Sequence, residues 1–338
     1  MEIKNKSPGV TIVIPNFNGV QIKFKNTPIL KLALDSLKIT KYNNYVVFVS
    51  DDHSGDVSIK FVKRHYSNVS IISSKKHGWY VGAANNALRI ILKQSKFKYV
   101  LFMNNDMIIK DPFWLTKMID VIEGDSTIGA EGCQLLYPTG LIQWAGMSFG
   151  KFKLFPHSLH RGERQKKILD VVKETYVASG IMLVRTELFR KFGIFDANFK
   201  MGGEETDFCI RMRNNGYRVV YNGRVKVIHL ESFTVTEYPD PKVKEMAKYL
   251  GMVSYIYFLR KNFSIPKQFL GLIALLGKSV FMLNRSEKDR IKSSESHRSV
   301  LFLRVQDEPL RQIYLALRAI KGGYLLKLNG KNLGIKEY

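Results

Sequence analysis

Three groups of acidic and amide side chains have the types and spacing that metal- or phosphate-dependent chemistry requires. They are Asp51 with Asp52, Asn104 with Asn105 and Asp106, and Glu204 with Glu205 and Asp207. Carboxylate oxygens bind divalent cations such as Mg²⁺, and a carboxylate near a reacting hydroxyl can accept its proton. Asp and Asn are also ordinary turn residues, and acids are common in the first turn of a helix. Whether these groups do chemistry therefore depends on the elements that position them.

The group that ends at Asp106 follows an unbroken apolar run. Residues 99–103 read Tyr-Val-Leu-Phe-Met and are followed at once by the two amides and the carboxylate. A short continuous apolar run predicts a buried strand of a parallel sheet. Ligands of open α/β sheets bind at the carboxyl ends of such strands, so Asp106 would lie where a metal or a phosphate is bound.

The first hundred residues alternate between strand and helix patterns. We expect strands at residues 10–14, 45–50, 69–73 and 99–103, and helices at 29–37, 58–66 and 83–94. This alternation predicts a doubly wound α/β arrangement, and right-handed crossovers make its sheet mainly parallel. The loops after the first, second and fourth strands all carry Asn or Asp, and the fold brings them to one edge of the sheet.

The middle of the chain predicts a more mixed sheet. Strands are expected at residues 129–136, 142–149, 176–184, 217–221 and 224–228, and a short helix at 187–192. His229 ends the last of these strands, where a histidine is more often a hydrogen-bonded structural residue than a ligand. Gly202 and Gly203 precede the acidic helix start and would allow a ligand to approach the backbone closely. Residues three apart share a helix face, so Glu204 and Asp207 are expected to share one environment and Glu205 to point elsewhere.

Composition restricts the class of protein. The 338 residues carry a formal net charge of +24, which indicates an anionic partner such as nucleic acid, an acidic membrane face or phosphorylated substrates. Two cysteines provide no disulfide pattern, and the first residues lack the apolar core of a signal peptide, so we expect a cytoplasmic protein. No apolar stretch is long enough to predict a transmembrane helix.

The C-terminal third concentrates the positive charge. Residues 241–338 contain 19 Lys and Arg against 7 Asp and Glu, a net +12. Helical patterns at residues 243–263, 269–283 and 313–320 combine basic with apolar and aromatic side chains, as in helices that bind anionic membrane surfaces. The alternative is a helical subdomain that packs on the preceding residues with its basic side chains in solvent. We expect a catalytic domain at residues 1–240 and a basic helical region at 241–338. Association of this region with the inner face of the cell membrane and packing as a subdomain both stay open, and one region can do both.

Taken together, the segments resemble family 2 glycosyltransferases, especially the rhamnosyltransferase-like members that build surface polysaccharides. The similar segments are residues 11–19, 49–56, 82–86, 103–106, 202–213 and 216–221 with His229, in the order in which the family has them. The resemblance implies a GT-A fold, a Rossmann-like mixed sheet flanked by helices. It also implies an inverting transfer from a nucleotide-sugar to a glycan or lipid-linked acceptor.

The resemblance also implies roles for individual residues. Asp106 and Asn104 fall on the family's Asp-x-Asp motif, which holds Mg²⁺ or Mn²⁺ on the diphosphate, and His229 would complete that site. Glu205 takes the position of the usual catalytic Asp, with Glu204 beside it and Asp207 as the substitute candidate. The donor-binding segments of the family place the following residues at the nucleotide-sugar: Pro15, Asn16, Asn18, Asp51, Asp52, Asn86, Asn104 and Asn105.

Two other classes of function remain open on the sequence. A nucleotide-sugar-binding protein without catalysis is possible if Glu205 cannot replace Asp. The positive charge alone suggests a nucleic-acid-binding protein, but no helix-turn-helix, zinc-finger or RNA-recognition signature is present, so we expect no nucleic-acid partner. A dinucleotide-dependent dehydrogenase is disfavoured because residues 15–19 lack the Gly-x-Gly-x-x-Gly pattern.

Overall fold

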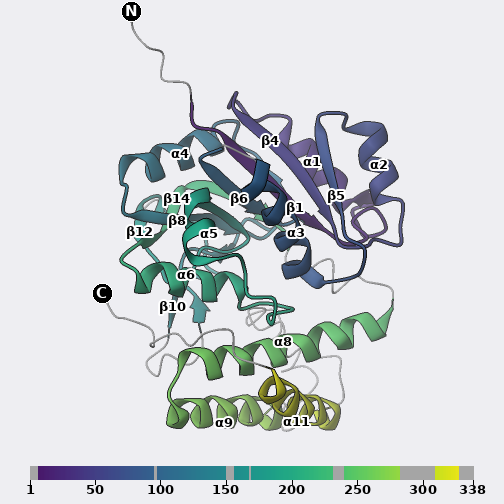
Figure 1. The fold of residues 1–338 in the computed structure, drawn as a ribbon, viewed down its shortest axis with the longest axis vertical. Coiled ribbons are helices and arrows are strands. Elements are labelled where there is room, and N and C mark those ends of the chain that lie inside the picture. The colour runs from purple at the N-terminus through teal and green to yellow at the C-terminus, as the bar shows by residue number, and fades with distance from the viewer. Residues whose placement is uncertain are drawn as a thin grey trace, which may run out of the picture.

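A computed structural model describes residues 7–94, 97–149, 156–166, 169–230, 240–281 and 309–326. One mixed sheet forms its centre, with helices on both faces and a layer of C-terminal helices below (Figure 1). The main path of the sheet runs through β12 (Val172–Glu174), β14 (Arg218–His229), β8 (Ile128–Leu136), β13 (Ile181–Arg185), β6 (Tyr99–Met103), β1 (Val10–Asn16), β4 (Tyr45–Asp51) and β5 (Val69–Ser73).

The half of the sheet from β6 to β5 is parallel, as the strand–helix alternation predicted. β13 is antiparallel to both β6 and β8, while β14 is parallel to β8. Two short strands lie beside this path: β7 (Met107–Ile109) pairs with β14, and β9 (Ile142–Trp144) pairs with β8. Two small ribbons, β2 (Lys23–Phe24) with β3 (Thr27–Pro28) and β10 (Met147–Phe149) with β11 (Pro156–Ser158), complete the described strands.

The helices cover the sheet through two hydrophobic cores. In chain order the described helices are α1 (Ile29–Leu37), α2 (Ser58–His65), α3 (Trp79–Gln94), α4 (Trp114–Gly124), α5 (Thr186–Phe192), α6 (Glu204–Asn214), α8 (Pro241–Asn262), α9 (Ile265–Phe281) and α11 (Pro309–Leu325). Side chains of α1, α2 and α4 pack in one core, and those of α3, α5, α6 and α8 pack in the other. Successive side chains of a strand point to opposite faces, so Phe102 of β6 enters the second core while Leu101 enters the first.

Two of the differences from the sequence prediction occur at glycines with positive φ. The strand expected at residues 142–149 is two strands, because the chain turns at Gly146 with φ of 92°. The strand expected at 176–184 begins only at Ile181, after Gly180 with φ of 77°. The break leaves Ser179 outside the sheet. The two strands expected at 217–221 and 224–228 are one strand, β14, with an irregularity after Asn222.

The C-terminal helices are packed against the rest of the protein. Ile256, Tyr257 and Phe258 of α8 are buried in the same core as α3, α5 and α6. α9 and α11 lie against α8 on its other side (Figure 1). The boundary at residue 240 stays a prediction, but α8 shares a core with the residues before it.

Within the described part of the chain, no helix has both the length and the apolar character needed to span a bilayer.

Candidate active site

The carboxyl ends of β1, β4 and β6 open into one pocket of about 350 Å³. The pocket is lined by side chains from these strand ends and from α3, the start of α6, the end of β14 and the start of α8. Its lining residues are Pro15, Asn16, Phe17, Asp52, His77, Trp79, Tyr80, Ala83, Asn104, Asn105, Asp106, Ser179, Met201, Gly202, Glu204, Glu205, His229 and Val243. The fold therefore brings together members of all three polar groups singled out in the sequence.

Asp106 and His229 form the candidate metal site. β7 follows Asp106 directly and pairs with the end of β14, which sets Met107 opposite His229. The two side chains meet with 3.2 Å between Asp106 Oδ1 and His229 Nε2, and Asn104 Nδ2 lies 3.5 Å from the same ring nitrogen. Asp106 is 4% exposed and His229 is half-buried, so both are shielded but open to the pocket.

Gln143 of β9 determines how His229 is oriented. Its Oε1 lies 2.5 Å from His229 Nδ1, on the opposite side of the ring from Asp106. A carboxamide oxygen accepts a hydrogen bond from Nδ1–H, and in this tautomer the lone pair of the ring lies on Nε2, which faces Asp106. Metal-bound histidines are held in this way by a second residue.

A carboxylate and a neutral imidazole suit Mn²⁺ or Mg²⁺ when substrate phosphate oxygens supply further ligands. The residues present therefore fit the divalent metal that the family resemblance implies. Among the described residues no group of three His, Cys, Asp or Glu side chains could hold a metal alone.

Glu204 and Glu205 both line the pocket at the start of α6. Gly203, with φ of 95°, is the residue before the helix, and a Cβ there would lie 2.8 Å from the Phe199 ring. Only glycine combines that conformation with that close approach. The tight turn sets the first two side chains of the helix toward the pocket.

Asp207 faces away from the pocket, which corrects the expectation that it shares an environment with Glu204. Its Oδ1 lies 2.8 Å from Lys261 Nζ and its Oδ2 accepts a hydrogen bond from Arg211 Nε at 3.0 Å. The side chain is fully buried. Both carboxylate oxygens are thus occupied by cations, so Asp207 is unsuited to accept a proton from a substrate.

Two hydrogen bonds from side chains hold the carboxylate of Glu205. Ser179 Oγ donates to Oε2 at 2.5 Å, and Tyr80 OH donates to Oε1 at 3.3 Å. Burial raises the pKa of Glu205, although the hydrogen bonds from Ser179 and Tyr80 act in the opposite direction. A carboxylate with a raised pKa is a better proton acceptor near neutral pH than an exposed one.

Glu204 is the more strongly perturbed neighbour. Burial and the negative charge of Glu205 raise its pKa to about 8. Its Oε2 accepts no hydrogen bond from any residue that the structure describes. Two adjacent carboxyl groups with raised pKa values in one pocket are typical of a functional site.

An aromatic wall lies at the other end of the pocket. The ring of His77 lies between those of Phe17 and Trp79, with centroid distances of 4.3 Å and 4.5 Å. Asp52 pairs with this ring, with 2.7 Å between its Oδ2 and His77 Nδ1, and its Oδ1 accepts a hydrogen bond from Gly78 N. Burial lowers the pKa of His77, but the Asp52 carboxylate outweighs it and raises the pKa.

Several predicted donor residues support the loops instead of lining the pocket. Asp51 is fully buried and accepts hydrogen bonds from Asn16 and from the backbone and side chain of Ser54. Asn18 Oδ1 accepts hydrogen bonds from two backbone N–H groups of the loop after β4. Asn86 donates to Ser74 Oγ and is not part of the pocket lining.

The sequence prediction missed the pocket residues Phe17, His77, Trp79, Tyr80, Ser179 and Gln143's contact with His229. Phe17 lies inside a segment that carried the resemblance and Ser179 inside the strand expected at residues 176–184, but their residue types have no distinctive chemistry. The helix was expected to begin at residue 83, but α3 begins at Trp79. His77 and Trp79 therefore lay in a segment for which the sequence predicted no element. No spacing pattern connects Gln143 to His229, since a strand pairing brings them together.

Comparison with known proteins identifies the family of this chain. The model of "Glycosyl transferase family 2" matches residues 11–193, more than half of the chain, and the chain belongs to this family. It is 28% identical over 235 residues to the O-antigen biosynthesis protein RfbC of Myxococcus xanthus, covering 67% of this chain and 18% of that protein. It is 26% identical over 211 residues to the rhamnosyltransferase WbbL of Escherichia coli K12, covering 59% of this chain and 78% of WbbL. The chain thus spans about a fifth of the length of RfbC.

Solved structures confirm the fold. The mannosyltransferase PcManGT of Pyrobaculum calidifontis, in complex with GDP-Man and Mn²⁺, superposes with a TM-score of 0.54 at 16% identity, covering 94% of this chain and 88% of that one. Residues 1–349 of S. aureus TarS superpose with a TM-score of 0.51 at 14% identity, covering 93% and 89%. The predicted GT-A fold is therefore confirmed, and the match to the family confirms the prediction of a glycosyltransferase.

Proposed function

We propose that the protein is an inverting, metal-dependent glycosyltransferase that moves a sugar from a nucleotide-sugar to an acceptor hydroxyl. The observation that carries the proposal is that one pocket holds both the Asp106–His229 pair and the hydrogen-bonded carboxylate of Glu205. Transfer needs one group for the leaving diphosphate and another for the acceptor proton, and the pocket provides both.

Glu205 is the general base of the proposed reaction. It accepts the proton of the acceptor hydroxyl while that oxygen forms a bond to the anomeric carbon. The bond from the anomeric carbon to the diphosphate oxygen breaks, and its electron pair leaves with the nucleoside diphosphate. Attack from the face opposite the leaving group inverts the anomeric configuration. Tyr80 and Ser179 keep the carboxylate of Glu205 oriented throughout.

Asp106 and His229 would hold the divalent metal, with Asn104 beside them. A bound Mg²⁺ or Mn²⁺ acts as a Lewis acid that neutralises the charge of the leaving diphosphate. The structures of PcManGT with GDP-Man and Mn²⁺ and of TarS with UDP-GlcNAc support a nucleotide-sugar donor here. The aromatic wall of Phe17, His77 and Trp79 is the surface on which a nucleobase would stack.

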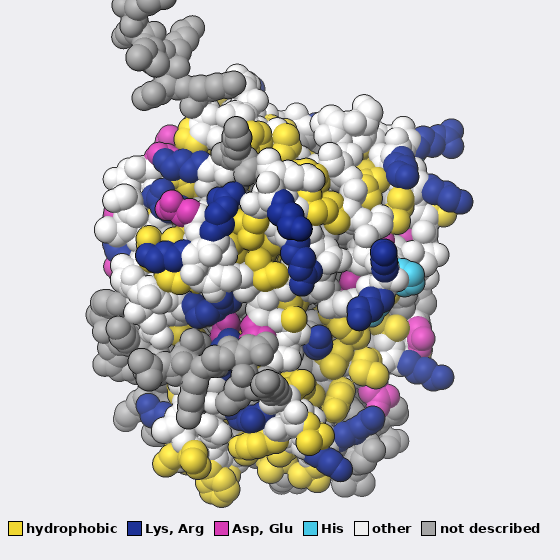
Figure 2. Space-filling model, in the orientation of Figure 1, with side chains coloured by type: hydrophobic (Ala, Val, Ile, Leu, Met, Phe, Trp, Pro, Cys, Tyr) yellow, Lys and Arg dark blue, Asp and Glu magenta, His cyan; other side chains and the backbone are white. Residues whose placement is uncertain are grey.

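The acceptor that fits best is a glycan or a lipid-linked glycan in surface polysaccharide synthesis. The similarity to RfbC and WbbL supports this pathway, and the C-terminal helices support a membrane-bound acceptor. Large apolar side chains are exposed on α9 and α11: Ile265, Phe269, Leu270 and Ile273, then Leu317, Tyr324 and Leu325. Figure 2 shows this apolar surface at the lower edge of the molecule with basic side chains around it. An apolar surface edged by Lys267 and Lys321 fits the inner, anionic face of a cell membrane.

A thermal-shift screen of nucleotide-sugars with and without Mn²⁺ tests the donor. A ligand that binds only the folded state raises the melting temperature, and the proposal expects a larger rise with Mn²⁺ present. The anomeric configuration of the product, read by NMR, tests inversion. No Mn²⁺-dependent shift with any nucleotide-sugar would contradict the proposal.

The substitution Glu205→Gln tests the base. Glutamine keeps the size of the side chain but cannot accept a proton, so donor binding should persist while turnover falls by about 10²–10⁴-fold. Turnover is measured as release of nucleoside diphosphate from the donor found in the screen. Glu187→Gln, an exposed substitution on α5, is the control. Near-normal turnover in Glu205→Gln would remove Glu205 from the reaction.

A further inference from the structure

One face of α8 presents three buried polar side chains to the segment that opens α6. Ser254, Tyr257 and Lys261 are at most 2% exposed and are spaced three and four residues apart, so they share a helix face. The described hydrogen bonds and ion pairs of their side chains go to residues 196–207. The same segment contains Met201, Gly202, Glu204 and Glu205 of the pocket lining.

Ser254 and Tyr257 hold the first part of this segment. Ser254 Oγ accepts hydrogen bonds from the backbone N–H groups of Lys200 at 3.0 Å and Met201 at 3.4 Å. Tyr257 OH donates to Asp196 Oδ2 at 2.8 Å and accepts from Asn198 Nδ2 at 3.1 Å. These contacts fix the loop that approaches the pocket.

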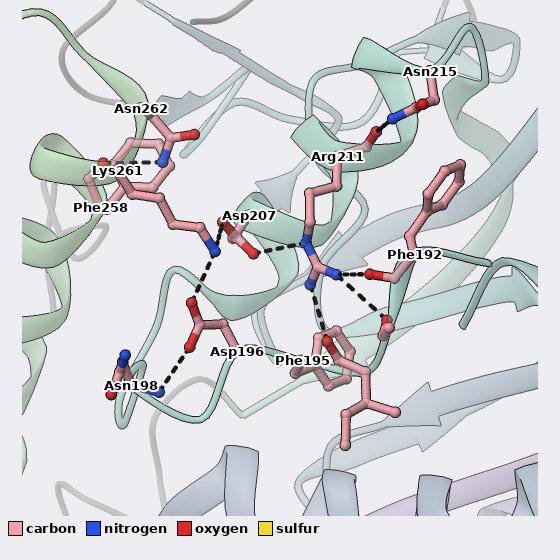
Figure 3. Close-up of polar contacts among 12 residues, drawn as sticks. Phe192, Phe195, Asp196, Asn198, Asp207, Arg211, Asn215, Phe258, Lys261 and Asn262 are labelled. Atoms are coloured by element: carbon pink, nitrogen blue, oxygen red, sulfur yellow. Dashed lines mark hydrogen bonds and ion pairs between the residues drawn. The ribbon is translucent and has the colours of Figure 1, made fainter. Parts of the chain in front are cut away.

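Lys261 holds both ends of the segment at once. Its Nζ lies 2.8 Å from Asp196 Oδ2 and 2.8 Å from Asp207 Oδ1, between the loop and the first turn of α6 (Figure 3). Burial disfavours the charged amine, but the Asp207 and Asp196 carboxylates outweigh this effect and raise the pKa of Lys261. A buried lysine that is paired in this way stays charged.

Arg211, the second partner of Asp207, extends the network to the end of α5. Arg211 donates to Asp207 Oδ2 and also to the backbone carbonyls of Phe192, Gly193 and Ile194 (Figure 3). Asp207 lies less than one turn after Glu204 and Glu205 on the same helix. The angle at which α6 presents these two carboxylates to the pocket is therefore fixed by where Asp207 is held.

We propose that Lys261 is a positioning residue for glycosyl transfer. It anchors Asp207 and Asp196 and so sets the rotation of α6 that directs Glu205 toward the acceptor. Lys261 lies outside the residues that match the family, so this chain supplies support for its base from the C-terminal region. The inference rests on the proposed function, because Glu205 is the group being positioned.

The test compares Lys261→Met with Lys261→Arg in the full chain. Methionine keeps most of the buried stem without the charge, and arginine keeps the charge. We expect Lys261→Met to lower kcat for nucleoside diphosphate release at least tenfold, with donor KM within about twofold, because the donor residues lie on other elements. Lys261→Arg should recover part of kcat. Lys60→Met, which removes an exposed lysine of α2, should leave kcat unchanged.

A second variant covers the case in which Lys261→Met does not fold. Asp207→Asn leaves Lys261 paired with Asp196 but weakens the link to α6, so it should fold and also lower kcat. We also measure kcat of Lys261→Met at temperatures well below its own melting temperature, where the variant is folded. A kcat equal to that of the wild type there would show a purely structural role and overturn the inference. Folding failure of both variants would also overturn it. If Glu205→Gln abolishes turnover and Lys261→Met does not, the positioning role fails while the proposed function stands.

Discussion

At the scale of single residues, Glu204 is the side chain whose environment has the clearest consequence. Burial and the negative charge of Glu205 disfavour the ionised carboxylate of Glu204, so the folded protein favours the neutral, protonated form. The proton that Glu204 holds in the folded protein is released in the unfolded chain at the same pH. The stability of the protein and the charge of the pocket are therefore connected through one residue.

We predict that this connection appears as a pH dependence of the melting temperature. The pKa of Glu204 rises from an ordinary value of 4.5 to about 8 in the folded protein. Between these pH values the folded state binds the proton that the unfolded state has lost, so the free energy of unfolding falls as pH rises. The melting temperature of Glu204→Gln should fall less steeply with rising pH over this range than that of the wild type. Identical slopes would mean that Glu204 is ionised in the folded protein, and Glu187→Gln should match the wild type.

At the scale of elements, three strands meet to build the metal site. β6 ends just before Asp106, β14 ends at His229, and β9 supplies Gln143. We predict that Gln143→Leu lowers the affinity for Mn²⁺ in the presence of nucleoside diphosphate by about 10–100-fold, since it frees His229 to rotate or to change tautomer. Asp106→Ala should abolish the Mn²⁺ dependence altogether.

Titration calorimetry with Mn²⁺ and nucleoside diphosphate measures both variants. The control is Gln165→Leu, which replaces an exposed glutamine in the segment before β12. Unchanged Mn²⁺ affinity in Gln143→Leu would show that His229 does not need this support, and unchanged affinity in Asp106→Ala would remove the carboxylate from the site.

How much of this arrangement the sequence predicts depends on the kind of element. The apolar run of residues 99–103 predicts β6 and the place of Asp106, because strand burial and sheet topology follow from local patterns. Helical spacing states which residues of α6 share a face but not how the helix is rotated. That rotation is set by Lys261, which is 54 positions beyond Asp207 in the chain. Contacts of this kind depend on the whole fold, so Asp207 was assigned to the wrong surroundings.

At the scale of the whole molecule, α8 packs the C-terminal region, residues 241–338, against the core of residues 1–240. A protein that ends at residue 240 would lose Ile256, Tyr257 and Phe258 from the core. Burial of a large apolar side chain contributes roughly 1.5–3 kcal/mol, so three of them approach the total stability of about 5–15 kcal/mol of a typical protein. Asp196 and Asp207 would also lose Lys261. We predict that this truncated protein shows no cooperative melting by circular dichroism, and a soluble truncated protein that binds donor would contradict the prediction.

Membrane binding must therefore be tested with single substitutions in the full chain. The apolar side chains of α9 and α11 point into solvent, and the C-terminal region carries a net +12. We predict that the protein binds vesicles containing phosphatidylglycerol at low salt and that binding weakens as salt rises, because the Debye length falls to about 10 Å at 0.1 M.

Phe269 is 64% exposed on α9, and Phe269→Glu should lower vesicle affinity about tenfold or more because it replaces an inserted apolar ring by a charge. Ile39→Glu places the same charge at an exposed apolar position after α1 and should bind like the wild type. Co-sedimentation measures all three proteins, and a wild-type protein that stays in the supernatant at low salt would rule out this surface as a membrane contact.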